Sequence, residues 1–204
     1  MAALWHLRFT LGFLAVMIAA NWAVGGGWHD LPAAALARWG ISNDDLTRGE
    51  IYRLITANFI SKHPRMLIDQ ITLSLCVIGW YEWHHGSLQA FAMFFVINTA
   101  GLLLTLIGGV ALLKEYSDLA ELGSLRDVGM SAGGFGLMGA ILADLPRKWL
   151  LLGGALVLLG AKFFVLPDSI ADIGHPITLL LGFGLELVLA AYRQSGGSMG
   201  PPSA

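Results

Sequence analysis

Six long apolar runs are the feature that most restricts how this chain can fold. A helix that crosses the hydrocarbon core of a bilayer needs about 20 mainly apolar residues, and runs of about 10 to 14 usually belong to other structures. Six runs satisfy this requirement, some narrowly: Leu7–Val24, Met66–Trp83, Gln89–Leu112, Val128–Leu145, Trp149–Leu166 and Ile170–Tyr192. They predict an all-α membrane protein with six transmembrane helices, forming one domain over residues 1–192.

The composition supports a membrane protein and argues against a soluble globule, a nucleic-acid-binding protein and a cysteine-based scaffold. Of the 204 residues, 56% are hydrophobic and only 13% are charged, too few to cover an ordinary soluble globule with polar surface. The net charge of -2 comes from scattered residues, so no basic patch indicates a nucleic-acid partner. Cys76 is the only cysteine, which excludes an internal disulfide framework and a cysteine-rich metal site. We expect the lipid bilayer as a partner, and neither a cofactor nor a metal ion.

Basic residues near the ends of the runs predict the orientation in the membrane. Arg8, the Arg147-Lys148 pair and Arg193 all fall on one side if the N-terminus is inside, and lysine and arginine in short loops are retained in the cytoplasm. We therefore expect a multi-pass protein of the cell membrane with both termini cytoplasmic. The first run is interpreted as a retained span, because no clean cleavage signal follows it. Residues 193–204, "RQSGGSMGPPSA", are expected to form a flexible tail.

The long polar and amphipathic stretch from Gly25 to Arg65 separates the first two runs. It contains two short helical patterns, "LPAAALARWGI" and "LTRGEIYRLITANF". A structureless loop of this length is uncommon within a compact domain. We expect the stretch to form structure that lies at the membrane interface.

One serine and one histidine are the best candidates for chemistry within the membrane. Ionisable residues at membrane depth are costly, and His175 lies about four residues into the sixth run. The fourth and sixth runs enter from the same face, so Ser131 and His175 should both lie within roughly one helical turn of that face. A serine hydroxyl becomes a good nucleophile when an imidazole removes its proton. Asp172 could orient the imidazole, or could serve only as an acidic residue at a helix start.

Glycines around the serine allow two interpretations. Gly129, Gly133, Gly136 and Gly139 have the three- and four-residue spacings that let membrane helices approach closely, so packing alone would explain them. However, Gly129 and Ser131 stand at the start of the span, where backbone N–H groups have no partner within the helix. Such groups, together with the positive end of the helix dipole, could stabilise an oxyanion formed at Ser131.

Two of these motifs resemble the rhomboid family of intramembrane serine proteases. The stretch "GMSAGGFGLMGA" is similar to the family's serine motif, with Ala132 where glycine is usual. The resemblance places Phe135 as the aromatic residue beside the catalytic histidine. The stretch "GHPITLLLG" keeps His175 and Gly182 at the family's spacing, with Thr178 in place of a glycine.

A third match lies before the second run, and the second run itself departs from the family pattern. "RGEIYRLITANF" resembles the family's stretch there, with Arg53 as its arginine. Rhomboids usually place a histidine and, four residues later, an asparagine in the second span, both binding the oxyanion. Here these positions are Met66 and Gln70. Methionine has no hydrogen-bond donor, whereas the Gln70 amide could replace asparagine. Asp69 should face elsewhere, and His63 could compensate if the helix starts early.

The resemblance implies a six-helix rhomboid-like bundle and a serine endopeptidase. Ser131 and His175 would form a dyad that cleaves transmembrane segments of other membrane proteins, with Gln70, Gly129 and Phe135 supporting it. One alternative is the rhombosortase-type relative that processes glycine-rich C-terminal anchors. Another is a rhomboid-like pseudoprotease that binds membrane clients without cutting them, favoured by Met66, Gln70 and Ala132.

Overall fold

The molecule is helical throughout the residues that the structure describes. The computed structural model describes residues 2–109, 126–165, 168 and 170–197. Within these ranges, β-type backbone pairing is limited to an isolated antiparallel bridge between Ile41 and Asp127. The prediction of an all-α fold is confirmed for this part of the chain.

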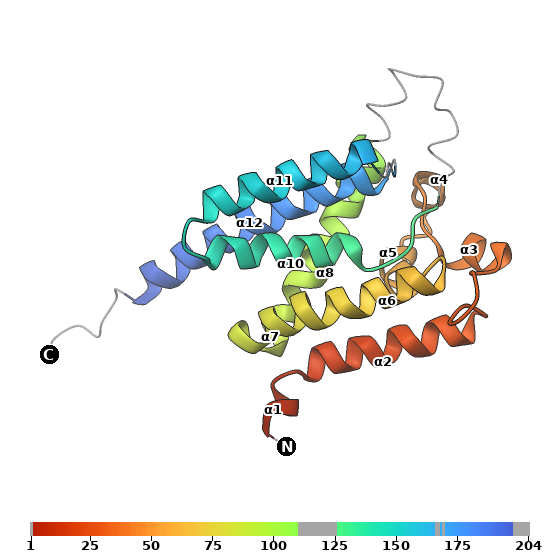
Figure 1. The fold of residues 1–204 in the computed structure, drawn as a ribbon, viewed down its shortest axis with the longest axis horizontal. Coiled ribbons are helices and arrows are strands. Elements are labelled where there is room, and N and C mark those ends of the chain that lie inside the picture. The colour runs from red at the N-terminus through yellow and green to blue at the C-terminus, as the bar shows by residue number, and fades with distance from the viewer. Residues whose placement is uncertain (1, 110–125, 166–167, 169, 198–204) are drawn as a thin grey trace, which may run out of the picture.

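Six helical segments coincide with the six apolar runs (Figure 1). Two of them continue through a π-helical turn, so each consists of consecutive elements. The segments are α2 (Arg8–Ala23); α6 (Pro64–Leu73), η2 (Ser74–Ile78) and α7 (Gly79–His85); α8 (Ser87–Leu103) and η3 (Leu104–Gly109); α10 (Ser131–Asp144); α11 (Lys148–Val165); and α12 (Ala171–Gly197). A short helix α1 (Ala2–Trp5) comes first. The predicted ends of the third and fifth runs, Leu112 and Leu166, lie outside the described residues.

Three of these segments are long and apolar enough to cross a membrane. They are Ser87–Gly108, Lys148–Val165 and Ala171–Ser195. Helix α2 is apolar but has only 16 residues. Helix α10 has 14 residues, and at about 1.5 Å per residue it is roughly 21 Å long, shorter than a hydrocarbon core of about 30 Å. The three long helices indicate a membrane-embedded protein, but helix length alone does not require six crossings.

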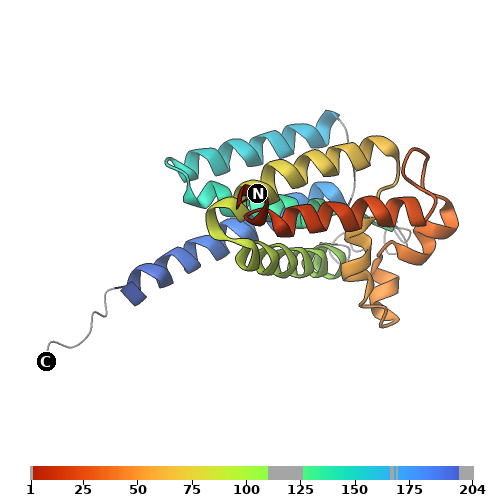
Figure 2. The same cartoon turned by 90° about the horizontal axis from the view of Figure 1, so that it is seen from below.

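Helix α10 is the centre of the bundle. It contacts α12, α8, η2 and α6, and Figure 1 shows it between α12 and α6 with α8 crossing behind. Figure 2 shows α2 on the outside of the bundle, where it packs against α8 and the second half of the α6–α7 segment. Small residues occupy most of α10, which is why neighbours can surround it.

Glycines bring the backbones of α10 and α12 into direct contact. A Cβ on Gly139 would overlap the Leu179 carbonyl, and a Cβ on Gly182 would overlap the Gly136 carbonyl. Membrane helices use small residues for close approach of this kind. The packing interpretation is therefore correct for Gly136 and Gly139. The contact also fixes how far α12 can slide along α10.

The segment between the first two runs forms short helices rather than a loose loop. These are α3 (Ala33–Trp39), α4 (Asn43–Thr47), α5 (Arg53–Thr56) and η1 (Ala57–Phe59). The second predicted pattern is not one helix: it is split at Gly49, whose φ of 82° is left-handed. Arg53 is buried and donates to the carbonyls of Ala37 (2.9 Å) and Gly40 (2.7 Å), so one side chain ties α5 to α3.

The prediction for the C-terminal tail was partly wrong. Helix α12 continues to Gly197, so the tail predicted from Arg193 starts inside a helix. The Arg193 side chain pairs with Glu186 about two turns earlier on the same helix. In both views the end of α12 projects beyond the other helices (Figures 1 and 2).

Candidate active site

A cavity of about 320 Å³ brings the predicted dyad together. Ser131 and Phe135 reach it from α10, His175 from α12, and Gln70 from α6. The other lining residues are Lys62, His63, Met66, Asp69, Leu73, Asp127, Val128, Asp168 and Ala171. Of the predicted site residues, only Gly129 is not part of the lining, although it lies directly behind Gln70.

Ser131 is the first residue of α10, with Met130 as the N-cap. The Gly133 N–H donates to Asn98 Oδ1 (3.2 Å) and the Gly134 N–H donates to the Met130 carbonyl (2.9 Å). In the described part of the chain, the N–H groups of Ser131 and Ala132 make no hydrogen bond. These free donors and the positive end of the helix dipole form an environment suited to an anion beside the Ser131 hydroxyl.

His175 lies on the first turn and a half of α12, half-buried. Its ring stacks on Phe135 with a centroid distance of 4.0 Å and an interplanar angle of 19°. The Nε2 atom is buried and has no hydrogen-bond partner in the described structure. Phe135 therefore holds the imidazole plane while leaving a ring nitrogen free at the cavity.

Ser131 and His175 face the same cavity without a direct hydrogen bond. Catalytic hydrogen bonds are often long or poorly aligned in ligand-free sites and shorten when substrate binds. Asp172 does not orient the imidazole by a hydrogen bond: its carboxylate accepts from Lys162 Nζ (2.5 Å) and from the Asp168 N–H (2.5 Å). Of the two roles considered for Asp172, the one at the helix start fits the structure.

Gln70 presents an unused donor to the cavity. The side chain is 3% exposed, and its Oε1 accepts from the Ser61 hydroxyl at 3.0 Å. This bond uses the amide oxygen. The other end of the amide, Nε2, is left buried and without a hydrogen-bond partner in the described structure. An unsatisfied buried donor costs about 1–3 kcal/mol. A bound oxygen with negative charge would remove this cost.

Gly129 positions Gln70 rather than donating a hydrogen bond into the cavity. Its N–H is already used by the Ala57 carbonyl at 2.7 Å, so the predicted oxyanion role of this amide does not fit the structure. Its φ is +105°, and a Cβ would overlap Gln70 Nε2 and contact the Met66 methyl at 2.7 Å. Glycine is thus required here by both backbone conformation and space.

The remaining second-run residues surround the cavity in other roles. His63 is the N-cap of α6, and its Nδ1 accepts from the Met66 N–H at 3.1 Å. Met66 Sδ accepts from the Lys62 N–H at 3.3 Å, so this side chain fills space beside the cavity. The expectation that Asp69 faces elsewhere was wrong, because it lines the exposed part of the cavity.

Two polar residues at the site were missed in the sequence. Asn98 lies in the apolar run of α8, fully buried, and besides accepting from Gly133 it donates to the Leu54 carbonyl at 3.3 Å. An amide within an apolar run was the available signal. Asp127 accepts from the Val128 N–H at 2.9 Å. Burial raises the pKa of the Asp127 carboxyl to about 6, partly opposed by Lys62.

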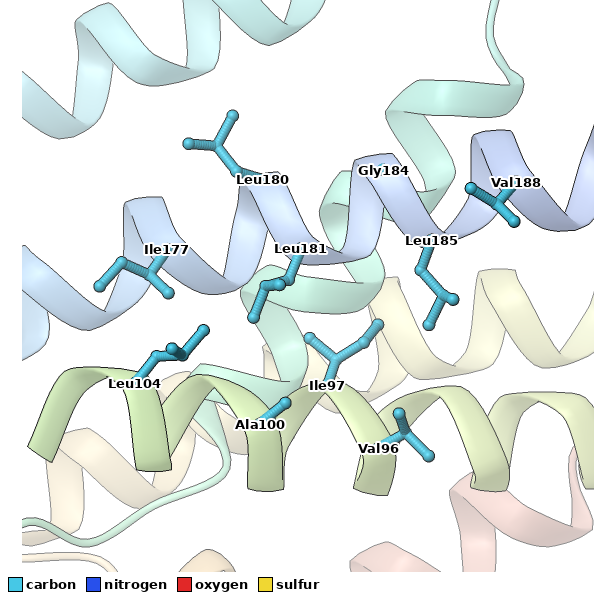
Figure 3. Close-up of a pocket in the computed structure, with 10 residues that line it drawn as sticks. All are labelled: Val96, Ile97, Ala100, Leu104, Ile177, Leu180, Leu181, Gly184, Leu185 and Val188. Carbon is cyan, nitrogen blue, oxygen red and sulfur yellow. The ribbon is translucent and has the colours of Figure 1, made fainter. Parts of the chain in front are cut away.

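A larger hollow lies between α8 and α12 and offers no chemistry. Its volume is about 570 Å³, and Figure 3 shows it lined by aliphatic side chains and one glycine. The lining contains no nucleophile, acid or base, and nothing there could hold a charged group. The apolar lining of this hollow suits contact with lipid or another apolar helix. The cavity that contains Ser131 and His175 is therefore the candidate site.

Comparison with known proteins provides no further evidence about the function of this site. Comparison of the sequence with protein-family models and with curated proteins finds no match. The case for a function rests on the residues that meet at the cavity.

Proposed function

We propose that the protein is a rhomboid-type intramembrane serine protease that cleaves transmembrane segments of other membrane proteins. The observation that carries the proposal is the meeting of three groups at one cavity: the Ser131 hydroxyl, His175 with a free Nε2, and the unpaired Gln70 Nε2. A nucleophile, a base and an oxyanion donor are the parts that acyl transfer requires. The six helical segments would form a six-span bundle in the cell membrane with both termini cytoplasmic.

The chemistry follows from these positions. His175 removes the proton from Ser131 as the hydroxyl attacks the scissile carbonyl carbon. The resulting oxyanion accepts hydrogen bonds from the Ser131 N–H and from Gln70 Nε2. His175 then protonates the leaving amine, the C–N bond breaks, and an acyl-enzyme forms on Ser131. Water, deprotonated by His175, hydrolyses this ester and restores the serine.

Two observations favour a second candidate, a pseudoprotease that binds membrane clients. Ser131 and His175 are not hydrogen-bonded to each other, and Met66 supplies no donor. Such a protein would still use the cavity to hold an unwound segment. It would not form a covalent bond through Ser131.

Covalent labelling separates the two functions. The purified protein in detergent is incubated with a fluorophosphonate probe and, separately, with a transmembrane substrate. Under the protease proposal, wild type labels and cleaves, Ser131→Ala and His175→Gln do neither, and His29→Gln, which replaces an exposed histidine outside the cavity, behaves like wild type. Equal labelling of wild type and Ser131→Ala would sink the protease proposal.

A further inference from the structure

Three metal-ligating side chains meet at the end of the bundle opposite the cavity. His85 is the last residue of α7, Asp144 is the last residue of α10, and Glu186 lies on α12. One potential ligand atom from each lies within 4.8 Å of the other two. Because Ser131 begins α10 and Asp144 ends it, the cluster is about 20 Å from the cavity along this helix. The proposed proteolysis makes no use of it.

The contact between His85 and Asp144 has the distance of an ion pair without the geometry of a hydrogen bond. His85 Nε2 lies 2.8 Å from Asp144 Oδ2, yet this buried nitrogen has no hydrogen-bond partner. Two ligands that each lie about 2.0–2.2 Å from a shared tetrahedral Zn²⁺ are separated by roughly 3.4 Å. The two atoms would therefore move apart by roughly 0.6 Å to bind one ion.

The Glu186 carboxylate is oriented by a second layer of polar groups. Its side chain is fully buried, and its Oε2 accepts from the Tyr81 hydroxyl at 2.5 Å. Gln89 Nε2 in turn donates to that hydroxyl at 3.1 Å. The Tyr81 ring also stacks on His85, with a centroid distance of 4.3 Å. Outer groups of this kind orient metal ligands and raise their affinity.

The charge of the cluster favours a cation. Asp144 and Glu186 carry two negative charges, and Arg193, which pairs with Glu186 Oε1, supplies one positive charge. The Arg193 side chain is 46% exposed, near the projecting end of α12, so it can move into solvent. With neutral His85, one negative charge remains uncompensated among these residues.

We propose that His85, Asp144 and Glu186 bind a divalent transition-metal ion, best matched by Zn²⁺. One imidazole nitrogen and two carboxylates are common zinc ligands, and a fourth position would be open to water. The ion would join α7, α10 and α12 at the end away from the cavity. These helices belong to the three segments that carry Gln70, Ser131 and His175.

The test measures zinc binding directly, so its result is independent of protease activity. Full-length protein without a histidine tag and with Cys76→Ser is stripped with chelator, titrated with Zn²⁺, desalted and assayed for metal. We expect one zinc per chain and a higher Tm with zinc. His85→Gln and Asp144→Asn should each weaken binding at least about tenfold. His84→Gln, which replaces the exposed neighbouring histidine, should bind like the parent.

Arg193→Gln distinguishes a metal site from a network of ion pairs. Without zinc, this variant should have a lower Tm, because Glu186 loses its partner. With a metal site, it should bind zinc more tightly, because the competing positive charge is gone. Zinc binding that is absent in the parent, unchanged in His85→Gln, or weakened by Arg193→Gln would overturn the proposal.

Discussion

The Gln70 amide occupies the space that Gly129 leaves by having no Cβ. The two residues come from α6 and from the turn before α10, and their close approach directs Gln70 Nε2 toward the cavity of Ser131. Ser61 fixes the other end of the same amide. The oxyanion donor of the proposed protease therefore depends on a glycine and a serine that do not line the cavity.

Removing the Gln70 donor should slow the chemical step. Loss of one oxyanion donor typically lowers kcat by about 10²–10³, so Gln70→Leu is expected to show this loss with KM little changed. Initial rates on a transmembrane substrate in proteoliposomes measure both constants. Thr72→Ala, which alters an exposed residue of the same helix outside the cavity lining, should not lower kcat. If Gln70→Leu cleaves at the wild-type rate, Gln70 has no part in catalysis.

Gly129→Ala should damage the site more than its backbone strain explains. Alanine at a positive φ costs more than about 1 kcal/mol, and here the new Cβ would also displace the Gln70 amide. Gly49→Ala is the matched control, because Gly49 also has a positive φ (82°) but nothing lies within 4 Å of its Cβ position. We expect both variants to lose stability in thermal unfolding and only Gly129→Ala to lose cleavage. Equal activity in the two variants would contradict this role of Gly129.

Gly139→Ala should separate α10 from α12. The added methyl would overlap the Leu179 carbonyl, and overpacking of this kind costs about 1–3 kcal/mol or more. Gly184→Ala on α12 is the control: no atom lies within 4 Å of its Cβ position, and alanine favours helix by up to about 1 kcal/mol. Denaturation in detergent should therefore show a lower free energy of unfolding for Gly139→Ala and an unchanged or higher one for Gly184→Ala. The reverse order would show that the backbone contact is not tight.

Asp127 should make stability fall as the pH rises. Its carboxyl keeps a proton in the folded protein up to a pKa of about 6, whereas the ordinary value is 3.8. Since the folded state binds the extra proton, the stabilisation is full below about pH 3.8 and is lost as the pH passes through about 6.

Thermal unfolding between pH 4 and pH 7 tests this dependence. Asp127→Asn should flatten the decrease in Tm, because the amide does not titrate. Asp30→Asn, at an exposed position outside the cavity, should keep the wild-type slope. A slope that persists in Asp127→Asn would assign the pH dependence to another group.

The positions of Ser131 and His175 could be predicted because they depend on local features. Apolar runs determine where α10 and α12 begin, and each residue lies near the start of its helix. The stacking of Phe135 on His175 agrees with the place of the aromatic residue in the serine motif. These features need only the period of a helix and the distance from its end.

Other parts of the site depend on contacts between distant segments and could not be predicted. Gln70 Nε2 has no partner because the Ser61 hydroxyl, from the preceding loop, donates to the oxygen of the same amide and fixes its orientation. The Gly129 amide looked free in the sequence, but its N–H donates to the carbonyl of Ala57, which lies in the segment between the first two runs. Glu186 stands in an apolar run, and its partner Tyr81 is known only once α7 and α12 are packed.

The contact between Gly136 and Gly182 is made by main-chain atoms. Side chains can change rotamer within nanoseconds, but a peptide group buried inside a helix cannot. The relative position of the two helix starts is therefore insulated from side-chain motion and from most substitutions at the exposed positions of α12. The exposed surface of α12 could therefore change in evolution to suit a different membrane while the distance between Ser131 and His175 stayed the same.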